Sequence, residues 1–74
     1  MSQAHSATVK LTLRLGDRLL DVAQVARDFL ILREPATSTA TEGTLLMSID
    51  GRVTETPIIL PRGLEAQAGR IAYF

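Results

Sequence analysis

The residues that could take part in chemistry are few in this sequence, and they are widely spaced. There is one histidine, His5, within a polar stretch near the start of the chain, and there is no cysteine. A metal site needs several ligands at fixed spacing, and a histidine that acts as a base needs a nucleophile or an orienting partner. We therefore expect no metal ion, no thiol chemistry and no functional role for His5.

Among the carboxylates, Glu55 is the most interesting candidate. Asp17 and Asp50 each adjoin a glycine, which is typical of turns. The alternation of strand residues would instead direct Glu55 to the apolar side of a sheet, and a buried carboxylate is a common mark of a functional site. The alternative explanations are a change of strand parity near Glu55, or an ion pair with an arginine at the rim of the sheet.

Motifs for phosphate binding and for hydrolysis are missing from the sequence. Gly63 and Gly69 enclose residues 64–68 without the lysine of a phosphate-binding loop. No nucleophile elbow, zinc-protease helix or calcium loop matches either. The sequence therefore predicts a protein that is not an enzyme, with no catalytic residues and no cofactor.

The composition predicts one small globular domain. The chain has 74 residues, of which 46% are hydrophobic, and its eight basic and eight acidic side chains cancel to a net charge of zero. A neutral chain has no field that attracts a polyanion from a distance, so we do not expect a nucleic-acid partner. We expect residues 1–7 to form a flexible leader and residues 8–74 to form a single β domain.

Several features indicate a cytoplasmic protein. The first eight residues lack the basic and apolar regions of a signal peptide. No apolar run approaches the roughly 20 residues of a membrane helix, so we expect no membrane association. The absence of cysteine fits a reducing compartment.

The clearest local pattern is the alternation of polar and apolar residues from Thr8 to Leu15, which predicts a strand with one solvent-exposed face and one buried face. Gly16-Asp17 then suits a two-residue type II′ turn, which would set Leu15 opposite Arg18 in a hairpin. The competing interpretation is a helix over residues 17–28, because polar residues recur there at nearly helical spacing.

A second hairpin is expected over Thr44 to Leu60, around Asp50-Gly51. A three-residue loop with a G1 bulge keeps apolar residues opposite apolar residues better than a two-residue turn does, so we predict the longer loop. Glu55 would then lie on the buried face of the sheet. We therefore expect a bulge near residues 55–57 that changes which face the following side chains point to. Because a proline lacks the ladder donor, this strand should lie at an edge of the sheet.

The remaining apolar segments complete the predicted sheet. Phe29 to Leu32 is apolar at every position, which predicts a strand covered on both faces. Ala36 to Gly43 is small and polar, as in a mobile surface loop. Leu64 to Ala68 suits one helical turn that Gly69 ends, and Arg70 to Phe74 suits a last short strand.

Two segments of the chain carry a resemblance. Val22 to Pro35 contains Val-Ala-Gln followed by Asp-Phe-Leu-Ile-Leu-Arg-Glu-Pro, and Ser48 to Gly63 runs from Ser-Ile-Asp-Gly to Ile-Leu-Pro-Arg-Gly. Together they resemble small all-β bacterial proteins of uncharacterised function, in which Gly-Pro stands where this chain has Ala26-Arg27. The resemblance favours strands over a helix and implies no active or binding residue.

These patterns together predict an all-β fold, in which five to six antiparallel strands form a small barrel or sandwich. The alternative is an α+β fold with a helix at residues 17–28. Because so short a chain has little second layer to cover its apolar strands, we expect a protein-binding module that self-associates as a homodimer or docks on a larger partner. The expected contact residues belong to the apolar strands and the end of the chain: Phe29, Ile31, Ile58, Leu60, Tyr73 and Phe74.

Binding of single-stranded nucleic acid is the alternative function. Small β-barrels bind single strands by combining basic grooves with exposed aromatic side chains. Here Tyr73 and Phe74 would supply the stacking surface, and Arg52, Arg62 and Arg70 would supply the charge.

Overall fold

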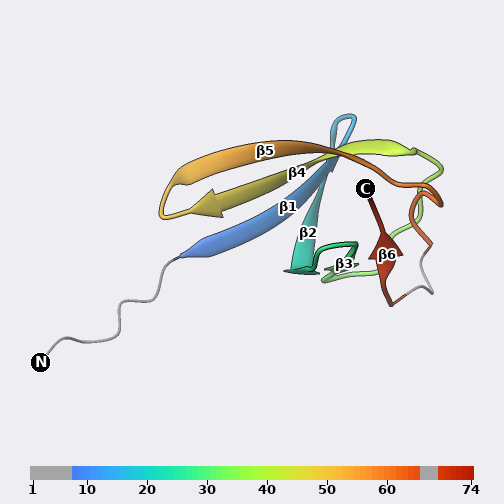
Figure 1. Cartoon of the computed structure of the whole chain (residues 1–74), viewed down its shortest axis with the longest axis horizontal. Helices are drawn as coiled ribbons and strands as arrows, with labels where there is room; N and C mark the ends of the chain where they lie inside the picture. The colour runs from blue at the N-terminus through green and yellow to red at the C-terminus, as the bar shows by residue number, and fades with distance from the viewer. Residues whose placement is uncertain (1–7, 66–68) are drawn as a thin grey trace, which may run out of the picture.

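The structure is a computed structural model that describes residues 8–65 and 69–74 (Figure 1). Its six strands form one antiparallel sheet in the order β5-β4-β1-β2-β3-β6. The strands are β1 (Val9–Leu15), β2 (Arg18–Val25), β3 (Phe29–Leu32), β4 (Glu42–Ile49), β5 (Arg52–Ile59) and β6 (Ile71–Ala72). No helix occurs in the described ranges, so the all-β prediction is confirmed. The alternative helix at residues 17–28 is wrong, because β2 occupies most of that segment.

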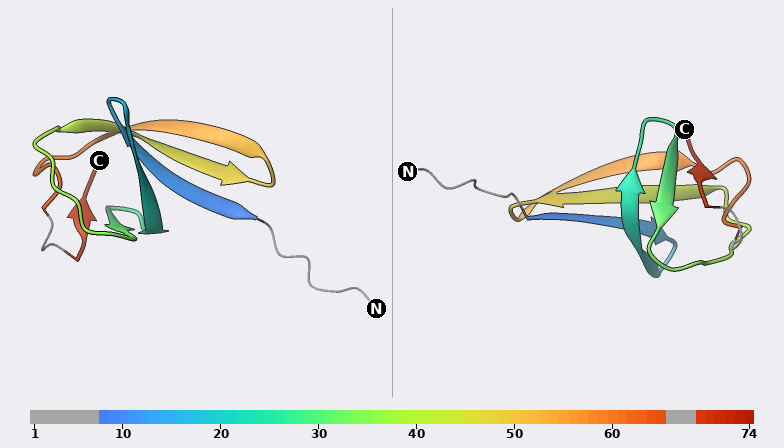
Figure 2. Two further views of the ribbon diagram at one scale, coloured as in Figure 1. Left: turned by 180° about the vertical axis from the view of Figure 1, so that it is seen from behind. Right: turned by 90° about the horizontal axis from the view of Figure 1, so that it is seen from below.

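The strand β2 belongs to two parts of the sheet. Its first half pairs with β1, and its second half pairs with β3 from Val22 opposite Leu32. The register shifts between Val22 and Gln24, and an irregularity of this kind bends a strand and increases its twist. Figure 2 shows the result, in which β2 and β3 cross beneath β1, β4 and β5. The sheet is therefore folded over itself into two layers.

The two edges of this folded sheet meet at one point. The Ile59 N–H donates to the Phe74 carbonyl oxygen, and the Phe74 N–H donates to the Ile59 carbonyl oxygen, both at 2.9 Å. Among the described strands, β5 has β4 as its only neighbour, so the sheet is not closed into a barrel. The edge position that Pro57 predicts for this strand is confirmed.

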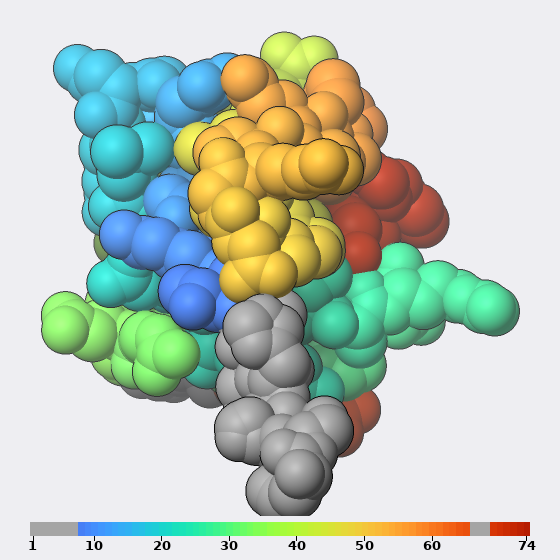
Figure 3. All heavy atoms as spheres, turned by 90° about the vertical axis from the view of Figure 1, so that its left-hand side faces the viewer, coloured from blue at the N-terminus to red at the C-terminus, as the bar shows by residue number. Residues whose placement is uncertain are grey.

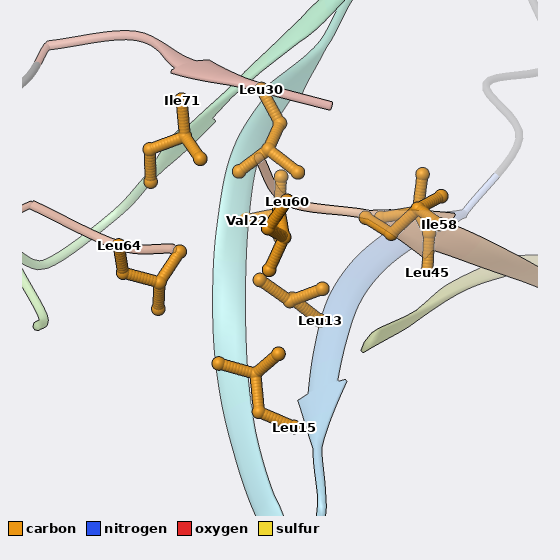
Figure 4. Close-up of a cluster of buried hydrophobic side chains, with 9 residues drawn as sticks. All are labelled: Leu13, Leu15, Val22, Leu30, Leu45, Ile58, Leu60, Leu64 and Ile71. Carbon is orange, nitrogen blue, oxygen red and sulfur yellow. The ribbon is translucent and has the colours of Figure 1, made fainter. Parts of the chain in front are cut away.

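The core lies between the two layers (Figure 4). Nine apolar side chains are buried there: Leu13, Leu15, Val22, Leu30, Leu45, Ile58, Leu60, Leu64 and Ile71. Full burial of such a side chain contributes about 1.5 to 3 kcal/mol relative to an exposed one. Every strand contributes to this cluster, so the core is what holds the two layers together.

The first predicted hairpin is confirmed. Leu15 lies opposite Arg18, and the pairing continues to Thr12 opposite Asp21. Gly16 has a φ of 60°, which a type II′ turn requires at its first central position. The alternation of polar and apolar residues determines this register, because a slip by one residue would turn every apolar side chain of the strand to solvent.

The second hairpin differs from the prediction. Asp50 and Gly51 have φ angles of 50° and 88°, so they form a two-residue type I′ turn that sets Ile49 opposite Arg52. The register then continues without a shift to the end of β5. The predicted three-residue loop and the change of parity near Glu55 are therefore wrong. The part of this hairpin near the turn extends beyond the second layer, so no covered face restricts the pairing there, and the turn chemistry of Asp50-Gly51 decides it.

The segment between β3 and β4 is held at its middle by a pair of backbone hydrogen bonds, in addition to the bonds that Arg33 and Thr41 make at its two ends. The Ser38 N–H donates to the Leu64 carbonyl oxygen at 3.1 Å, and the Leu64 N–H donates to the Ser38 carbonyl oxygen at 2.9 Å. The predicted loop over Ala36 to Gly43 is thus anchored to the chain after β5. Leu64 lies in this bridge rather than in a helical turn. The rest of that predicted turn, at residues 66–68, lies outside the described residues, as do the predicted leader over residues 1–7 and His5 within it.

Candidate interaction surface

The sheet face that forms the core continues past the second layer. From the core to the hairpin tip, this face carries three cross-strand pairs of β1 and β4: Leu13 with Leu45, Leu11 with Met47, and Val9 with Ile49. Exposure rises along the series, because the first pair is buried, the second is half-buried, and Val9 and Ile49 are 54% and 43% exposed. We call the last two pairs, Leu11, Met47, Val9 and Ile49, the distal apolar face.

The distal apolar face exists because the two layers differ in length. The strands β4 and β5 have eight residues each, which corresponds to about 26 Å, whereas β3 has four residues and β6 has two. The shorter layer covers the half of the longer layer that lies away from the hairpin tip (Figure 1). The apolar alternation of β1 and β4 nevertheless continues over their full length, so apolar side chains reach solvent at the uncovered end.

The rim of this face is uncharged except at the tip. On β5, the residues that share the face are Arg52, Thr54 and Thr56, which are all exposed. Arg52 and Thr54 line an open hollow together with Ile49 and Asp50. Figure 3 views the molecule from this end, with the hairpin tip in gold and the start of β1 in blue toward the viewer. No acidic side chain of β1, β4 or β5 belongs to this face, and the one carboxylate beside it, that of Asp50 in the turn, accepts a hydrogen bond from the Thr8 N–H at 2.9 Å.

The opposite face of the same strands is mixed, with charged and polar side chains beside Leu46, Val53 and Ile59. Lys10, Thr12 and Arg14 of β1 lie on it, and so does Glu55 of β5. The Arg14 Nη2 donates to the Glu55 Oε1 at 3.1 Å. Glu55 is therefore exposed in an ion pair with an arginine, which was one of the alternatives, and it does not face the apolar side.

This ion pair should contribute little to stability. The Arg14 and Glu55 side chains are 41% and 58% exposed, so water screens the attraction between them. A double-mutant cycle of Arg14→Ala, Glu55→Ala and the double variant, measured by urea unfolding, should give a coupling energy of about 0.5 kcal/mol or less. The coupling should decrease further at high salt, and a value above about 1.5 kcal/mol would contradict this assignment.

The structure divides the predicted contact residues into two groups. Ile58 and Leu60 are 3% and 0% exposed and belong to the chain's own core, so they present no surface to a partner. Phe29, Ile31 and Tyr73 are half-buried, and Phe74 is 78% exposed. The distal apolar face was not among the predicted contact residues. Its signal in the sequence was present, because the alternation over Val9 to Leu15 is longer than one short second layer can cover.

The residues expected to bind nucleic acid are only partly brought together. Arg62 and Arg70 line one hollow that also contains Glu65, whereas Arg52 lies at the other end of β5. The Arg70 guanidinium carbon lies 4.6 Å from the centre of the Phe29 ring. The Tyr73 hydroxyl donates to the Ala26 carbonyl oxygen, so this aromatic residue is held against the turn before β3.

The described residues form no metal site and no membrane helix. Within residues 8–65 and 69–74, no group of three His, Cys, Asp or Glu side chains is placed to hold a metal ion, and no polar or charged side chain is buried. The same residues contain no helix that is long and apolar enough to cross a membrane. Comparison with protein-family models, curated proteins and solved structures gives no match.

Proposed function

We propose that this protein is a small non-catalytic interaction module that binds protein through the distal apolar face, either a second copy of itself or a larger partner. The observation that carries the proposal is the exposure of Val9 and Ile49, which lie side by side and extend the core into solvent. Apolar surface that is continuous with a core and left open is commonly buried against another chain. The absence of cysteine supports the cytoplasm as the compartment in which it acts.

The size of the surface supports a weak association. Covering the exposed halves of Val9 and Ile49 contributes on the order of 1 kcal/mol for each side chain. A standard stable interface has about 20 to 30 residues on each side, far more than the distal apolar face provides. We therefore expect weak self-association, with a Kd of about 0.1 to 1 mM, which light scattering at high protein concentration can detect.

The proposal is tested by making the distal apolar face polar without changing its β propensity. The double variant Val9→Thr, Ile49→Thr replaces two exposed apolar side chains by β-branched polar ones. Light scattering of the wild-type protein should show a mass that rises above the 8.0 kDa of one chain as concentration increases. The double variant should need at least about tenfold more protein to reach the same mass, which corresponds to 1.4 kcal/mol.

The matched control changes the other face of the same two strands. Lys10 and Ser48 form the neighbouring cross-strand pair, so Lys10→Thr, Ser48→Thr should associate as the wild type does. A wild-type chain that stays monomeric at high micromolar concentration would contradict self-association. Equal behaviour of the two double variants would contradict the assignment of the face. Binding to a single-stranded oligonucleotide that weakens steeply with salt would favour the alternative function.

A further inference from the structure

Within residues 8–65 and 69–74, the outer edge of β5 over residues 52–57 has no strand beside it, and its backbone groups form a second surface that could bind a strand. Leu60 donates its N–H to the Thr41 carbonyl oxygen on the β4 side, at 2.7 Å, whereas Ile59 bonds to Phe74 on the other side. Backbone groups of successive strand residues point alternately to the two sides. The N–H and C=O groups of Val53 and Glu55 are therefore directed away from β4, toward the open edge.

The position of Pro57 agrees with this assignment. Pro57 is two residues from Ile59, so its missing N–H belongs to the open edge and removes no bond to β4. Toward the core end, the edge stops at Ile59, where Phe74 already occupies it. Toward the tip, it stops at the turn after Ile49. The open edge thus consists of residues 52–57, with two complete pairs of donor and acceptor at Val53 and Glu55.

Natural proteins protect such edges with lysines, bulges, prolines or a covering segment. Here the register of β4 with β5 continues without a shift, and residues 52–56 contain neither lysine nor proline. The strand is rich in β-branched residues, and Val53 is 61% exposed. The one carboxylate on the edge, Glu55, is already paired with Arg14. An added strand therefore meets little opposition along these residues.

We propose that this edge pairs with β5 of a second copy of the chain, antiparallel, about a two-fold axis at Thr54. In this register Val53 of each copy lies opposite Glu55 of the other, which joins the two complete donor and acceptor pairs and makes four hydrogen bonds. Arg52 lies opposite Thr56 on the face shared with the distal apolar face. Thr54 lies opposite its own counterpart, and such threonine pairs favour antiparallel strands.

The register centred on Glu55 is worse on two counts. It sets Val53 opposite Pro57, which has no N–H to donate, and it places the two Glu55 carboxylates directly opposite each other, which is destabilising. The register centred on Val53 pairs Glu55 with Gly51, which already belongs to the turn. The edge is thus self-complementary in one register, and this property favours a second copy over an unrelated strand as its occupant. A pair of five-residue strands covers less than a standard interface, so the dimer should be weak.

Cysteine cross-linking tests this register, because the chain has no cysteine of its own. In the proposed pair, the two Thr54 Cα atoms are about 4.5 Å apart, within the range that a disulfide spans. The two Thr56 Cα atoms are separated by about 13 Å along the strands, which a disulfide cannot bridge. Under mild oxidation of the full chain at high micromolar concentration, Thr54→Cys should form covalent dimers at least about tenfold faster than Thr56→Cys. Both variants replace an exposed threonine on the same face of the same strand.

A second pair of variants tests the backbone bonds themselves. Added to Thr54→Cys, Glu55→Pro removes one edge N–H without removing a bond to β4, whereas Glu55→Ala keeps that N–H and loses the same ion pair. Cross-linking should slow with the proline and continue with the alanine, and circular dichroism confirms that each variant keeps its strands. Equal cross-linking at positions 54 and 56, or equal effects of proline and alanine, would overturn the edge pairing.

The proposal for the edge of β5 and the proposal for the distal apolar face can be refuted independently of each other. We expect Thr54→Cys to cross-link equally well when it is combined with Val9→Thr, Ile49→Thr, because the edge pairing does not use those two side chains. Cross-linking that persists there supports the edge, whatever the distal apolar face binds. Loss of cross-linking in that background would overturn the edge as an independent surface. Concentration-dependent association without selective cross-linking at position 54 would overturn the edge register and leave the proposed function standing.

Discussion

Gly63→Ala should destabilise the fold by about 3 to 5 kcal/mol, enough to unfold a large part of so small a domain. A Cβ atom at this position would lie 2.3 Å from the carbonyl oxygen of Ser38 and 3.3 Å from its carbonyl carbon. These are backbone atoms, and they belong to the bridge with Leu64 that anchors the segment between β3 and β4. The obstacle cannot rotate away as a side chain would, so the two segments must separate.

The matched control for this substitution is Gly16→Ala. Gly16 has the same φ of 60° as Gly63, but a Cβ atom there would meet nothing within 4 Å. The cost should therefore be only that of holding an alanine at the positive φ of a type II′ turn, about 1 to 3 kcal/mol. Urea unfolding followed by circular dichroism measures both variants. Equal losses of stability at the two glycines would show that backbone conformation, and not the contact with Ser38, explains the need for glycine at position 63.

The parts of the fold that could be predicted from the sequence are those in which one strand face is covered. The alternation from Val9 to Leu15 predicts β1, and the same alternation fixes the register of the Gly16-Asp17 hairpin, because a slip would expose Leu13 and Leu15. A strong local pattern and a nearby turn are sufficient for this hairpin. No information from distant segments is needed.

The second hairpin could not be predicted by the same reasoning. The matching of apolar with apolar residues favoured a three-residue loop, but every residue from Arg52 to Pro57 is exposed in the structure. Where neither face is covered, a register has no apolar face to preserve. The preference of Asp50-Gly51 for a type I′ turn then decides the pairing. The inward orientation expected for Glu55 depended on the wrong loop and is wrong with it.

The candidate site depends on which apolar strands the second layer covers, and no single segment of the sequence contains that information. Phe29 to Leu32 and Ile58 to Leu60 are visibly apolar in the sequence, but their burial depends on which layer lies over them. The structure places Leu30, Ile58 and Leu60 between the layers and leaves the tips of β1 and β4 uncovered. That outcome follows from the difference in length between β3 and β4, which pack in different layers.

The distal apolar face and the core consist of the same strands, yet they should respond differently to substitution. Val9 and Ile49 are half exposed in the chain, so their replacement by threonine removes little buried area and should cost less than about 1 kcal/mol of stability. This separation of binding from folding makes the proposed function testable. A buried core residue should behave in the opposite way, because its replacement should lower the stability of the single chain and leave the contact surface unchanged.

Leu60 is such a core residue, and its replacement by alanine should lower the free energy of unfolding by about 2 to 5 kcal/mol. The side chain is fully buried in the core, and its N–H donates to the Thr41 carbonyl oxygen at 2.7 Å, which keeps the backbone fixed around the cavity. Because neighbouring side chains cannot fill that cavity completely, the loss includes both the transfer of the removed methyl groups and the empty volume. Urea unfolding at two protein concentrations measures the loss.

The comparison with Ile59→Ala distinguishes a core residue from a contact residue. Ile59 is the next residue before Leu60, on the opposite face of the chain and 46% exposed, so its loss should cost less than about 1 kcal/mol. If Leu60 acts within one chain, the destabilisation by Leu60→Ala is the same at low and high protein concentration. If Leu60 instead stabilised a contact between chains, as its apolar strand suggested, the loss would grow with concentration, because association adds stability only where chains meet. A concentration-dependent loss would therefore contradict the burial of Leu60 in the core of a single chain.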